Sequence, residues 1–358
     1  MASATSAPAS GPVSCAKLAA SLTLHQRVGQ LLMVGVSSGG LSSRDKRVLA
    51  KHQVGSVIFL GNSRAGATRI RRLTRSARAA TPRPRQIRTL LAVDQEGGTV
   101  QRLRGSGFST IPSASRQAKM SDARLASSAR TWARQLKAVG IDADLAPVAD
   151  VVPASLVAVN KPIGVLKRGY GPNPYVVARK AGAFVRGMDR AGVASSTKHF
   201  PGLGRVRGNT DFTARVVDSS TTRTDPALRG FAGAISAGVD MVMVPSAYYA
   251  KIDRNRRAVF SPTVMQQMLR RNLEFGGVII SDDLSARAVL DLSPGQRSVR
   301  FLAAGGDLII VGNAASVSAM TSAVVAQARR SKTFSAAVTA KTARVLTMKA
   351  RRGLAPCA

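Results

Sequence analysis

The chain has 358 residues, 45% of them hydrophobic, so it is long enough to bury the core of one large α/β domain. Its net charge of +35, from 53 basic and 18 acidic residues, indicates anionic surroundings such as a cell-wall polymer, an acidic lipid or a nucleic acid. Specific nucleic-acid binding is disfavoured, because no such motif is present and only 4% of the residues are aromatic. A simpler interpretation is that Lys and Arg cover exposed helix faces, as in residues 69–75.

The two ends of the chain differ in character from its middle. Residues 1–13 are rich in Ala, Ser and Pro and lack the apolar core of a signal peptide. We predict a flexible leader over residues 1–21, one domain over 22–350 and a C-terminal tail over 351–358. Cys15 and Cys357 form a disulfide in one interpretation and are two unpaired thiols in the other. A disulfide would favour a secreted or cell-envelope location, and no stretch is apolar enough to span a membrane.

Eight short segments are predicted to be strands, and most are continuous apolar runs typical of parallel strands buried on both faces. In chain order they are residues 30–36, 54–60, 90–94, 141–150, 193–200, 239–244, 277–282 and 307–311. The helices predicted around them begin after Thr23 and cover 43–52, 69–79, 123–139, 175–191, 226–237, 262–273, 296–304 and most of 314–350. This alternation predicts a single-domain (β/α)8 TIM barrel. A doubly wound sheet is the alternative, and the lack of a G-x-G-x-x-G motif after the first strand weakens it.

Polar side chains follow several of the predicted strands at the point where each strand ends. The third strand delivers Asp94, the fifth Lys198 and His199, and the seventh Asp282 and Asp283. In a parallel barrel the carboxyl ends of the strands form one mouth, where the chemistry occurs. We predict Asp283 to be a structural partner of its strand end. The predicted site residues are Asp94, Arg102, Arg168, Lys198, His199, Asp211 and Asp282.

Two carboxylates across a pocket are typical of glycoside hydrolysis, where one attacks the anomeric carbon and the other protonates the leaving oxygen. Asp282, at a rigid strand end, is the predicted nucleophile, and Asp211, in a Gly-flanked loop, is the predicted acid/base. Asp94, Lys198 and His199 would hold sugar hydroxyls through charge-assisted hydrogen bonds. The alternative is a structural ion-pair network around the strand ends.

Other chemistries fit the sequence less well. A serine triad is disfavoured because no G-x-S-x-G motif accompanies any of the three histidines. Asp94, His199 and Asp282 could imitate a metal-ligand set, but no Cys/His cluster supports one, and we expect neither a metal nor another cofactor. Residues 312–313, Gly-Asn, are a weak candidate for a phosphate-binding loop.

Four motifs together resemble glycoside hydrolase family 3, in particular its single-domain β-N-acetylhexosaminidase branch. They are VDQEGG at 93–98, followed by VQR at 100–102, LAPV at 145–148, KHFPG at 198–202 and ISDDL at 280–284. The resemblance spans residues 22–350 and implies a (β/α)8 barrel, a retaining mechanism and release of terminal N-acetylglucosamine from peptidoglycan or chitin-derived glycans. It also implies that Asp282 is the nucleophile. The sugar-binding residues that it implies are Asp94, Arg102, Arg168, Lys198 and His199.

One motif departs from that branch, which usually carries Asp-Ser-His in the loop after the fifth strand, with His as the acid/base oriented by Asp. This chain has Asn209-Thr210-Asp211 at the corresponding place. An aspartic acid can replace the histidine if its pKa is raised, whereas nearby cations such as Arg205 and Arg207 would lower that pKa. Two alternatives therefore stay open, a catalytically impaired sugar-binding protein and β-glucosidase-type specificity.

Overall fold

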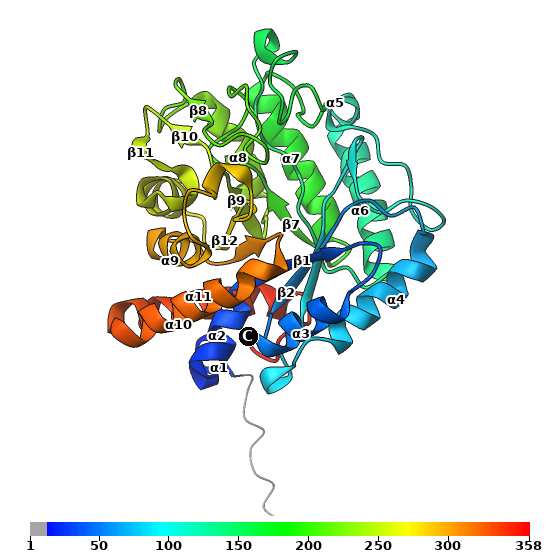
Figure 1. The fold of residues 1–358 in the computed structure, drawn as a ribbon. Coiled ribbons are helices and arrows are strands. Elements are labelled where there is room, and N and C mark those ends of the chain that lie inside the picture. Colours follow the sequence, from blue (N-terminus) through cyan, green and yellow to red (C-terminus); the bar gives the residue numbers. More distant parts are fainter. Residues whose placement is uncertain (1–12) are drawn as a thin grey trace, which may run out of the picture.

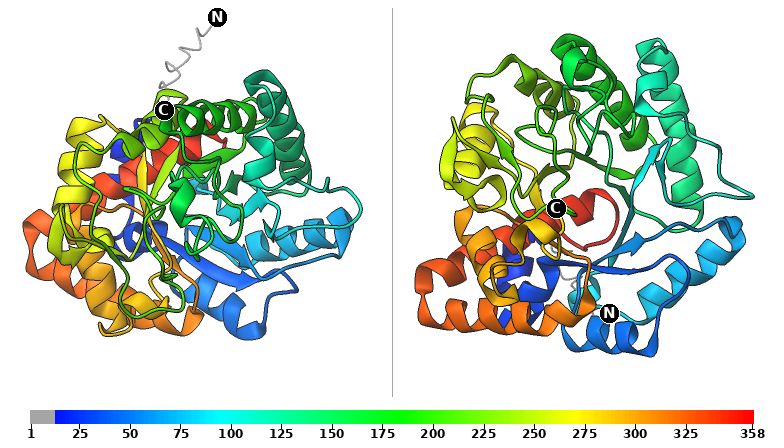
Figure 2. Two further views of the ribbon diagram at one scale, coloured as in Figure 1. Left: turned by 90° about the horizontal axis from the view of Figure 1, so that it is seen from above. Right: turned by 45° about the horizontal axis from the view of Figure 1, so that its top comes forward.

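The computed structural model describes residues 13–358, so most of the predicted leader, residues 1–12, lies outside it. Eight parallel strands form the centre of the molecule and helices surround them (Figures 1 and 2). The strands are β1 (Leu32–Ser37), β2 (Ser56–Leu60), β3 (Leu90–Val93), β6 (Ala143–Asp144), β7 (Ala194–Thr197), β9 (Met241–Val244), β12 (Val278–Ser281) and β13 (Ile309–Val311). Each overlaps one predicted strand, and the predicted (β/α)8 architecture is confirmed.

The strands are arranged as a barrel whose order in space follows the chain. Each strand pairs in parallel with the next, and β13 pairs with β1 through Leu32 and Ile309. The remaining junction, between β12 and β13, is a parallel bridge from Ile280 to Leu308, with the Ser281 N–H donating to the Leu308 carbonyl at 3.0 Å. All eight carboxyl ends therefore meet at one mouth.

The helices begin where the sequence supplies capping residues. Thr23 and Ser293 each form a capping box, and Asn173 caps a helix whose first residue is Pro174. The longer helices are α2 (Leu24–Gln30), α3 (Ser43–Lys51), α4 (Gly66–Ala79), α6 (Asp122–Ala138), α7 (Pro174–Asp189), α8 (Arg229–Ser236), the π-helical η5 (Thr263–Asn272), α9 (Pro294–Ala304), α10 (Val317–Arg330) and α11 (Lys332–Arg351). Their apolar faces and the strands share one hydrophobic core.

Short elements extend the loops beyond the carboxyl ends of the strands. The hairpin β4 (Gln95–Gly97) and β5 (Val100–Gln101) follows β3, before α5 (Ala114–Gln117). A small sheet joins β8 (Val217–Asp218), β10 (Tyr248–Tyr249) and β11 (Asp253–Arg257). The single turn η4 (Ala258–Phe260) follows β11 directly, and the single turn η6 (Arg287–Val289) comes after β12. These elements shape the walls of the mouth.

The segments that flank the predicted domain are folded against it at both ends. Residues 15–21 are not part of a flexible leader but form helix α1 (Cys15–Ser21), in which Leu18 is buried against residues of α11. Residues 351–358 are not a loose tail, because Leu354 is buried and its carbonyl accepts the Arg88 N–H at 2.7 Å. A disulfide joins Cys15 to Cys357, as one of the two interpretations predicted. Helix α1 was not predicted because its segment is rich in Ala and Ser and has only one small apolar face.

None of the helices in residues 13–358 combines the length and the apolar character that a membrane span requires.

Candidate active site

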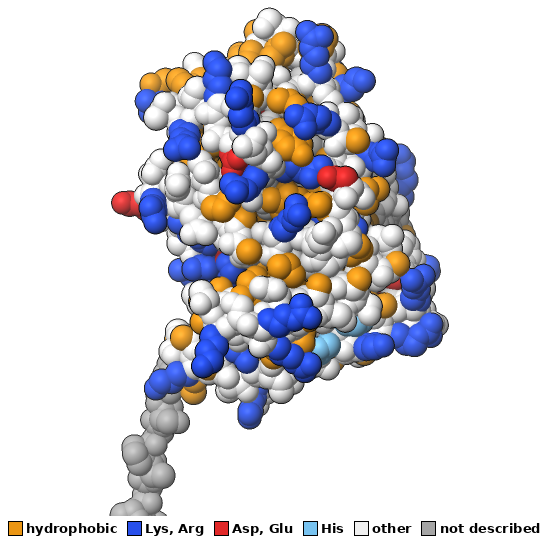
Figure 3. Space-filling model, turned by 60° about the vertical axis from the view of Figure 1, so that its left-hand side comes forward, with side chains coloured by type: hydrophobic (Ala, Val, Ile, Leu, Met, Phe, Trp, Pro, Cys, Tyr) orange, Lys and Arg blue, Asp and Glu red, His pale blue; other side chains and the backbone are white. Residues whose placement is uncertain are grey.

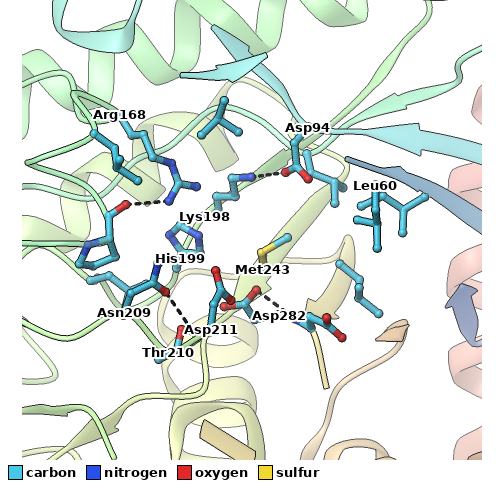
Figure 4. A pocket seen from close by; sticks show the side chains of 18 of the residues that line it. Leu60, Asp94, Arg168, Lys198, His199, Asn209, Thr210, Asp211, Met243 and Asp282 are labelled. Carbon is cyan, nitrogen blue, oxygen red and sulfur yellow. Dashed lines mark hydrogen bonds and ion pairs between the residues drawn. The ribbon is translucent and has the colours of Figure 1, made fainter. Parts of the chain in front are cut away.

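A cavity of about 430 Å³ opens at the carboxyl ends of the strands. Ile58, Leu145, Met243 and Ile310 contribute apolar surface from around the barrel. All seven predicted site residues line this cavity, and Figure 4 shows six of them converging on it. The structure thus brings together side chains that are spread from position 94 to position 282 in the sequence.

Lys198 is the centre of a buried charge cluster on one side of the cavity. Its Nζ lies 2.6 Å from Oδ1 of Asp94 and 2.7 Å from Oε1 of Glu96. Glu96 in turn receives a bidentate pair from Arg168, with Nη2–Oε1 at 2.7 Å and Nε–Oε2 at 2.8 Å. Two cations and two carboxylates therefore balance one another in this cluster.

The pKa values within this cluster follow from burial and pairing. Burial alone would lower the pKa of Lys198, but the charges of Asp94 and Glu96 outweigh it and raise that pKa. Burial would likewise raise the pKa of Glu96, but Arg168 and Lys198 hold it well below its usual range. Lys198 and Glu96 consequently remain charged at neutral pH.

Glu96 is a site residue that the sequence analysis did not assign. It does not line the cavity and exposes only 4% of its side chain, whereas Asp94 exposes 16% and faces the cavity. Glu96 thus fixes the side chains of Lys198 and Arg168 from outside the lining of the cavity. A usable signal was present in the sequence, because Glu96 is one of only two glutamates and follows a buried strand.

His199 is held by Asp150, a second residue that was not assigned to the site. Nδ1 of His199 lies 2.8 Å from Oδ2 of the fully buried Asp150, whose Oδ1 accepts the N–H of Leu203 at 2.6 Å. A carboxylate only accepts hydrogen bonds, so Nδ1 carries a proton and Nε2 is the ring nitrogen left for a ligand. Asp150 therefore fixes both the ring and the loop after β7.

Arg102 and Arg168 reach the cavity from loops. Nη1 of Arg102, just after β5, donates to Oδ1 of Asn62 at 3.2 Å. Nη1 of Arg168, in the long loop after β6, donates to the carbonyl of Pro162 at 2.8 Å. Both guanidinium groups are therefore held in place, Arg168 by an ion pair and Arg102 by a neutral amide.

Asp282 is the first residue after β12 and lines the cavity. Its N–H donates to the Val244 carbonyl at 2.9 Å, and its Oδ1 accepts the N–H of Asp283 at 3.0 Å. Burial raises the pKa of Asp282 to about 6; the negative charge of Asp211 adds to this effect and His199 opposes it. A carboxyl group with this pKa is mostly ionised at neutral pH while remaining poorly solvated.

Asp283 also lines the cavity, and its carboxylate joins two strand ends. Its Oδ1 accepts the N–H groups of Gly312 at 2.8 Å and Ser285 at 2.7 Å. A Cβ at position 312 would lie 2.2 Å from Oδ2 of Asp283, so this contact requires glycine. The N–H of Asn313 is also taken, by Oγ of Ser285 at 3.2 Å. These bonds show a structural use for Asp283, and they occupy the backbone donors of the weak phosphate-loop candidate.

Asp211 lies on a loop that is fastened to the segment after β12. The N–H groups of Arg287 and Ala288 in η6 donate to the carbonyls of Asp211 at 3.2 Å and Thr210 at 3.1 Å. Figure 4 shows the Asp211 carboxyl group pointing into the cavity beside Asp282. Asn209 accepts the N–H of Asp211 at 3.0 Å, so it shapes the loop backbone.

Arg205, one of the two cations expected to act on Asp211, has another partner. Nη2 of Arg205 lies 3.0 Å from Oδ1 of Asp225, and its Nη1 donates to Thr221. Arg205 is thus committed to this ion pair, which the sequence did not reveal. Among residues 13–358 no group of three or more His, Cys, Asp or Glu side chains is arranged to hold a metal ion.

Comparison with known proteins identifies the family. Residues 23–348 match the model of the glycosyl hydrolase family 3 N terminal domain. The chain belongs to glycosyl hydrolase family 3. A β-hexosaminidase of Idiomarina loihiensis is 37% identical over 290 residues, covering 79% of this chain and 83% of that relative. One from Vibrio cholerae is 34% identical over 286 residues, covering 79% and 82%.

Solved structures of family 3 proteins extend the likeness to the whole fold. A β-N-acetylhexosaminidase from Beutenbergia cavernae superposes with a TM-score of 0.90 at 40% identity, covering 92% of this chain and 99% of that one. A family 3 β-N-acetylglucosaminidase from Paenibacillus gives 0.83 at 28% identity, covering 93% of this chain and 63% of that one. The family inferred from the four motifs is therefore confirmed, and the roles of the seven site residues stay predictions.

Proposed function

We propose that this family 3 protein is a retaining exo-glycosidase that releases terminal β-N-acetylglucosamine from cell-wall or chitin-derived glycans. The observation that carries the proposal is that Asp282 and Asp211 face one cavity, opposite the Lys198 cluster. The β-hexosaminidase relatives support the choice of sugar. This activity would make the protein a hydrolase of peptidoglycan turnover.

In the first step the ionised Asp282 attacks the anomeric carbon, and a bond forms between its carboxylate oxygen and that carbon. The glycosidic C–O bond breaks, and its electron pair leaves with the aglycone oxygen, which takes a proton from Asp211. The pKa of about 6 leaves Asp282 ionised at neutral pH, and burial removes the water that would shield it.

In the second step Asp211, now a carboxylate, takes a proton from a water molecule as that water attacks the same carbon. The bond to Asp282 breaks, its electron pair returns to the carboxylate, and the sugar leaves with the original configuration. Retaining enzymes place their two carboxyl groups about 5–5.5 Å apart. The attachment of the Asp211 loop to η6 would keep the proposed acid on the side of the cavity that bears Asp282.

The Lys198 cluster is suited to an uncharged sugar. Lys198 and Arg168 offer donors, Asp94 offers an acceptor, and the negative charge of Glu96 completes the balance. A site without net charge favours hydroxyl groups over a free carboxylate, and charge-assisted hydrogen bonds to hydroxyls fix the ring. His199, through Nε2, and Arg102 would bind further sugar oxygens.

A location outside the cytoplasm is part of the proposal. The disulfide between Cys15 and Cys357 favours an oxidising compartment, and the net charge of +35 would retain the protein on an anionic wall polymer. Fractionation of the producing cells tests the location, and a purely cytoplasmic pool would contradict it. Co-sedimentation with anionic wall polymer should decrease steeply as salt is added.

The activity is tested with aryl β-N-acetylglucosaminides and the matching aryl β-glucosides. We expect turnover of the first series by the wild type, a loss of about 10³-fold or more in Asp282→Asn, and little change in the surface control Asp291→Asn. Asp211→Asn should lose most activity on poor leaving groups, and azide, which needs no base, should restore turnover of activated substrates.

The same experiment separates the alternatives. Faster turnover of the glucosides would favour β-glucosidase-type specificity. Binding of N-acetylglucosamine without turnover of either series would favour the impaired sugar-binding protein.

A further inference from the structure

A second cavity, of about 440 Å³, lies between β11, η4 and α9. It shares no lining residue with the catalytic cavity. Figure 3 views the side of the molecule that bears these elements, where Lys and Arg side chains are numerous and acidic side chains are few. We call this space the arginine cavity, after Arg256, Arg257 and Arg300, which line it.

The polar groups of the arginine cavity are mostly hydrogen-bond donors. Three guanidinium groups face one carboxylate, that of Asp291, so the lining carries a net charge of three minus one, or +2. Within the described residues Arg300 forms no ion pair, and Arg256 approaches only Asp253, at 3.7 Å. The lining therefore has more positive charge than its own acidic residue can neutralise.

Arg257 is the buried member of this set and is only partly satisfied. It is 9% exposed, and its Nη2 lies 2.7 Å from Oδ1 of Asp291. Its Nε is buried and has no hydrogen-bond partner in residues 13–358. A buried donor without a partner costs stability, which a bound acceptor would offset.

Aromatic and apolar side chains complete the cavity. Tyr248 and Phe260 line it, and the guanidinium of Arg257 lies over the Tyr248 ring, 5.1 Å from its centroid. Stacking of this kind holds the planar guanidinium in one orientation, so less entropy is lost when it binds a ligand. Ala303 on α9 also lines the cavity.

We propose that the arginine cavity binds a small ligand that carries an oxyanion, a carboxylate or a phosphate, on a partly apolar body. Arg256 and Arg300 would bind the anion as a fork, and the apolar body would pack on Tyr248 and Phe260. A neutral sugar would leave the excess positive charge unmatched, so this site differs in ligand class from the catalytic cavity. The proposal does not depend on hydrolysis.

The test is calorimetric titration of the full chain with inorganic phosphate at fixed ionic strength. The wild type should show saturable binding, and Arg256→Gln with Arg300→Gln should weaken it about tenfold or more. The matched control, Arg72→Gln with Arg75→Gln on the exposed face of α4, removes the same charge and should leave binding unchanged. A parallel titration with acetate ranks phosphate against carboxylate.

A steric variant distinguishes a cavity site from diffuse surface attraction. Ala303→Phe fills the arginine cavity without changing any charge and should abolish saturable binding. The inference is overturned if the wild type shows no saturable binding, if both arginine pairs weaken binding equally, or if Ala303→Phe binds phosphate as well as the wild type.

Discussion

Asp211 and Asp282 face the same cavity, and the charge of Asp211 is one cause of the raised pKa of Asp282. Burial is the larger cause, and together they bring that pKa to about 6. Two like charges at close range make the second ionisation harder, so the proposed acid raises the pKa of the proposed nucleophile. A neutral histidine at position 211 would not have this effect.

The first prediction concerns the pH profile of kcat/KM. Protonation of Asp282 removes the nucleophile, so kcat/KM should fall as the pH drops through about 6. Asp211→Asn removes a negative neighbour, which lowers the pKa of Asp282 and should move this acid limb to lower pH. The measurement uses an activated aryl substrate, because its leaving group needs no proton.

Asp291→Asn is the control for this shift, since Asp291 does not line the catalytic cavity. An acid limb that stays in place in Asp211→Asn would mean that Asp211 does not act on Asp282 in solution.

The second prediction concerns Glu96→Gln. Among the described residues the substitution leaves Lys198 with Asp94 as its ion-pair partner and Arg168 with none, and breaking a buried pair costs about 3–5 kcal/mol. We expect the free energy of unfolding to drop by that order and KM to rise. Urea denaturation measures the first effect and steady-state kinetics the second.

Glu274→Gln is the matched control, because Glu274 is the other glutamate of the chain and is exposed. Equal stability of the two variants would show that the buried network contributes nothing.

The third prediction concerns Asp150→Asn. An amide holds Nδ1 of His199 less firmly than a carboxylate, and the loop after β7 loses a charged acceptor at Leu203. We expect KM to rise about 10–100-fold, as for the loss of one charge-assisted hydrogen bond. A double-mutant cycle with His199→Ala should show strong non-additivity, and additive effects would contradict a positioning role for Asp150.

The fourth prediction concerns the disulfide between Cys15 and Cys357. Opening it, by reduction or by Cys15→Ser with Cys357→Ser, should lower the free energy of unfolding by about 2–5 kcal/mol. Helix α1 should then exchange its amide hydrogens faster than the barrel strands. Reductant should lower the Tm of the wild type and leave that of the double variant unchanged; an equal effect on both would contradict the bond.

The strands could be predicted because their physical signal is local. Segments such as 90–93 and 241–244 are continuous apolar runs, and burial on both faces of a parallel strand demands that pattern. The position of Asp94, Lys198 and Asp282 in one cavity then followed from the rule that strand ends share a mouth.

Other parts of the site depend on contacts between distant segments and could not be read from local pattern. Nothing around Asp150 indicates that it meets His199, and nothing around Asp211 indicates that its loop binds η6. Strands β8 and β10 have two residues each, too few for any periodicity. The small apolar face of α1 was hidden within an Ala- and Ser-rich segment for a similar reason.

The disulfide between Cys15 and Cys357 also determines on which side of the barrel a solid support or a fusion partner can be coupled. Its neighbours include Gly277, just before β12, and the Leu354 carbonyl bonds to Arg88, just before β3. Cys15 and Ala358 therefore lie at the amino ends of the strands, on the side of the barrel opposite the cavity mouth. A solid support or fusion partner coupled beside either residue would leave the mouth facing outward, free to work on an insoluble glycan.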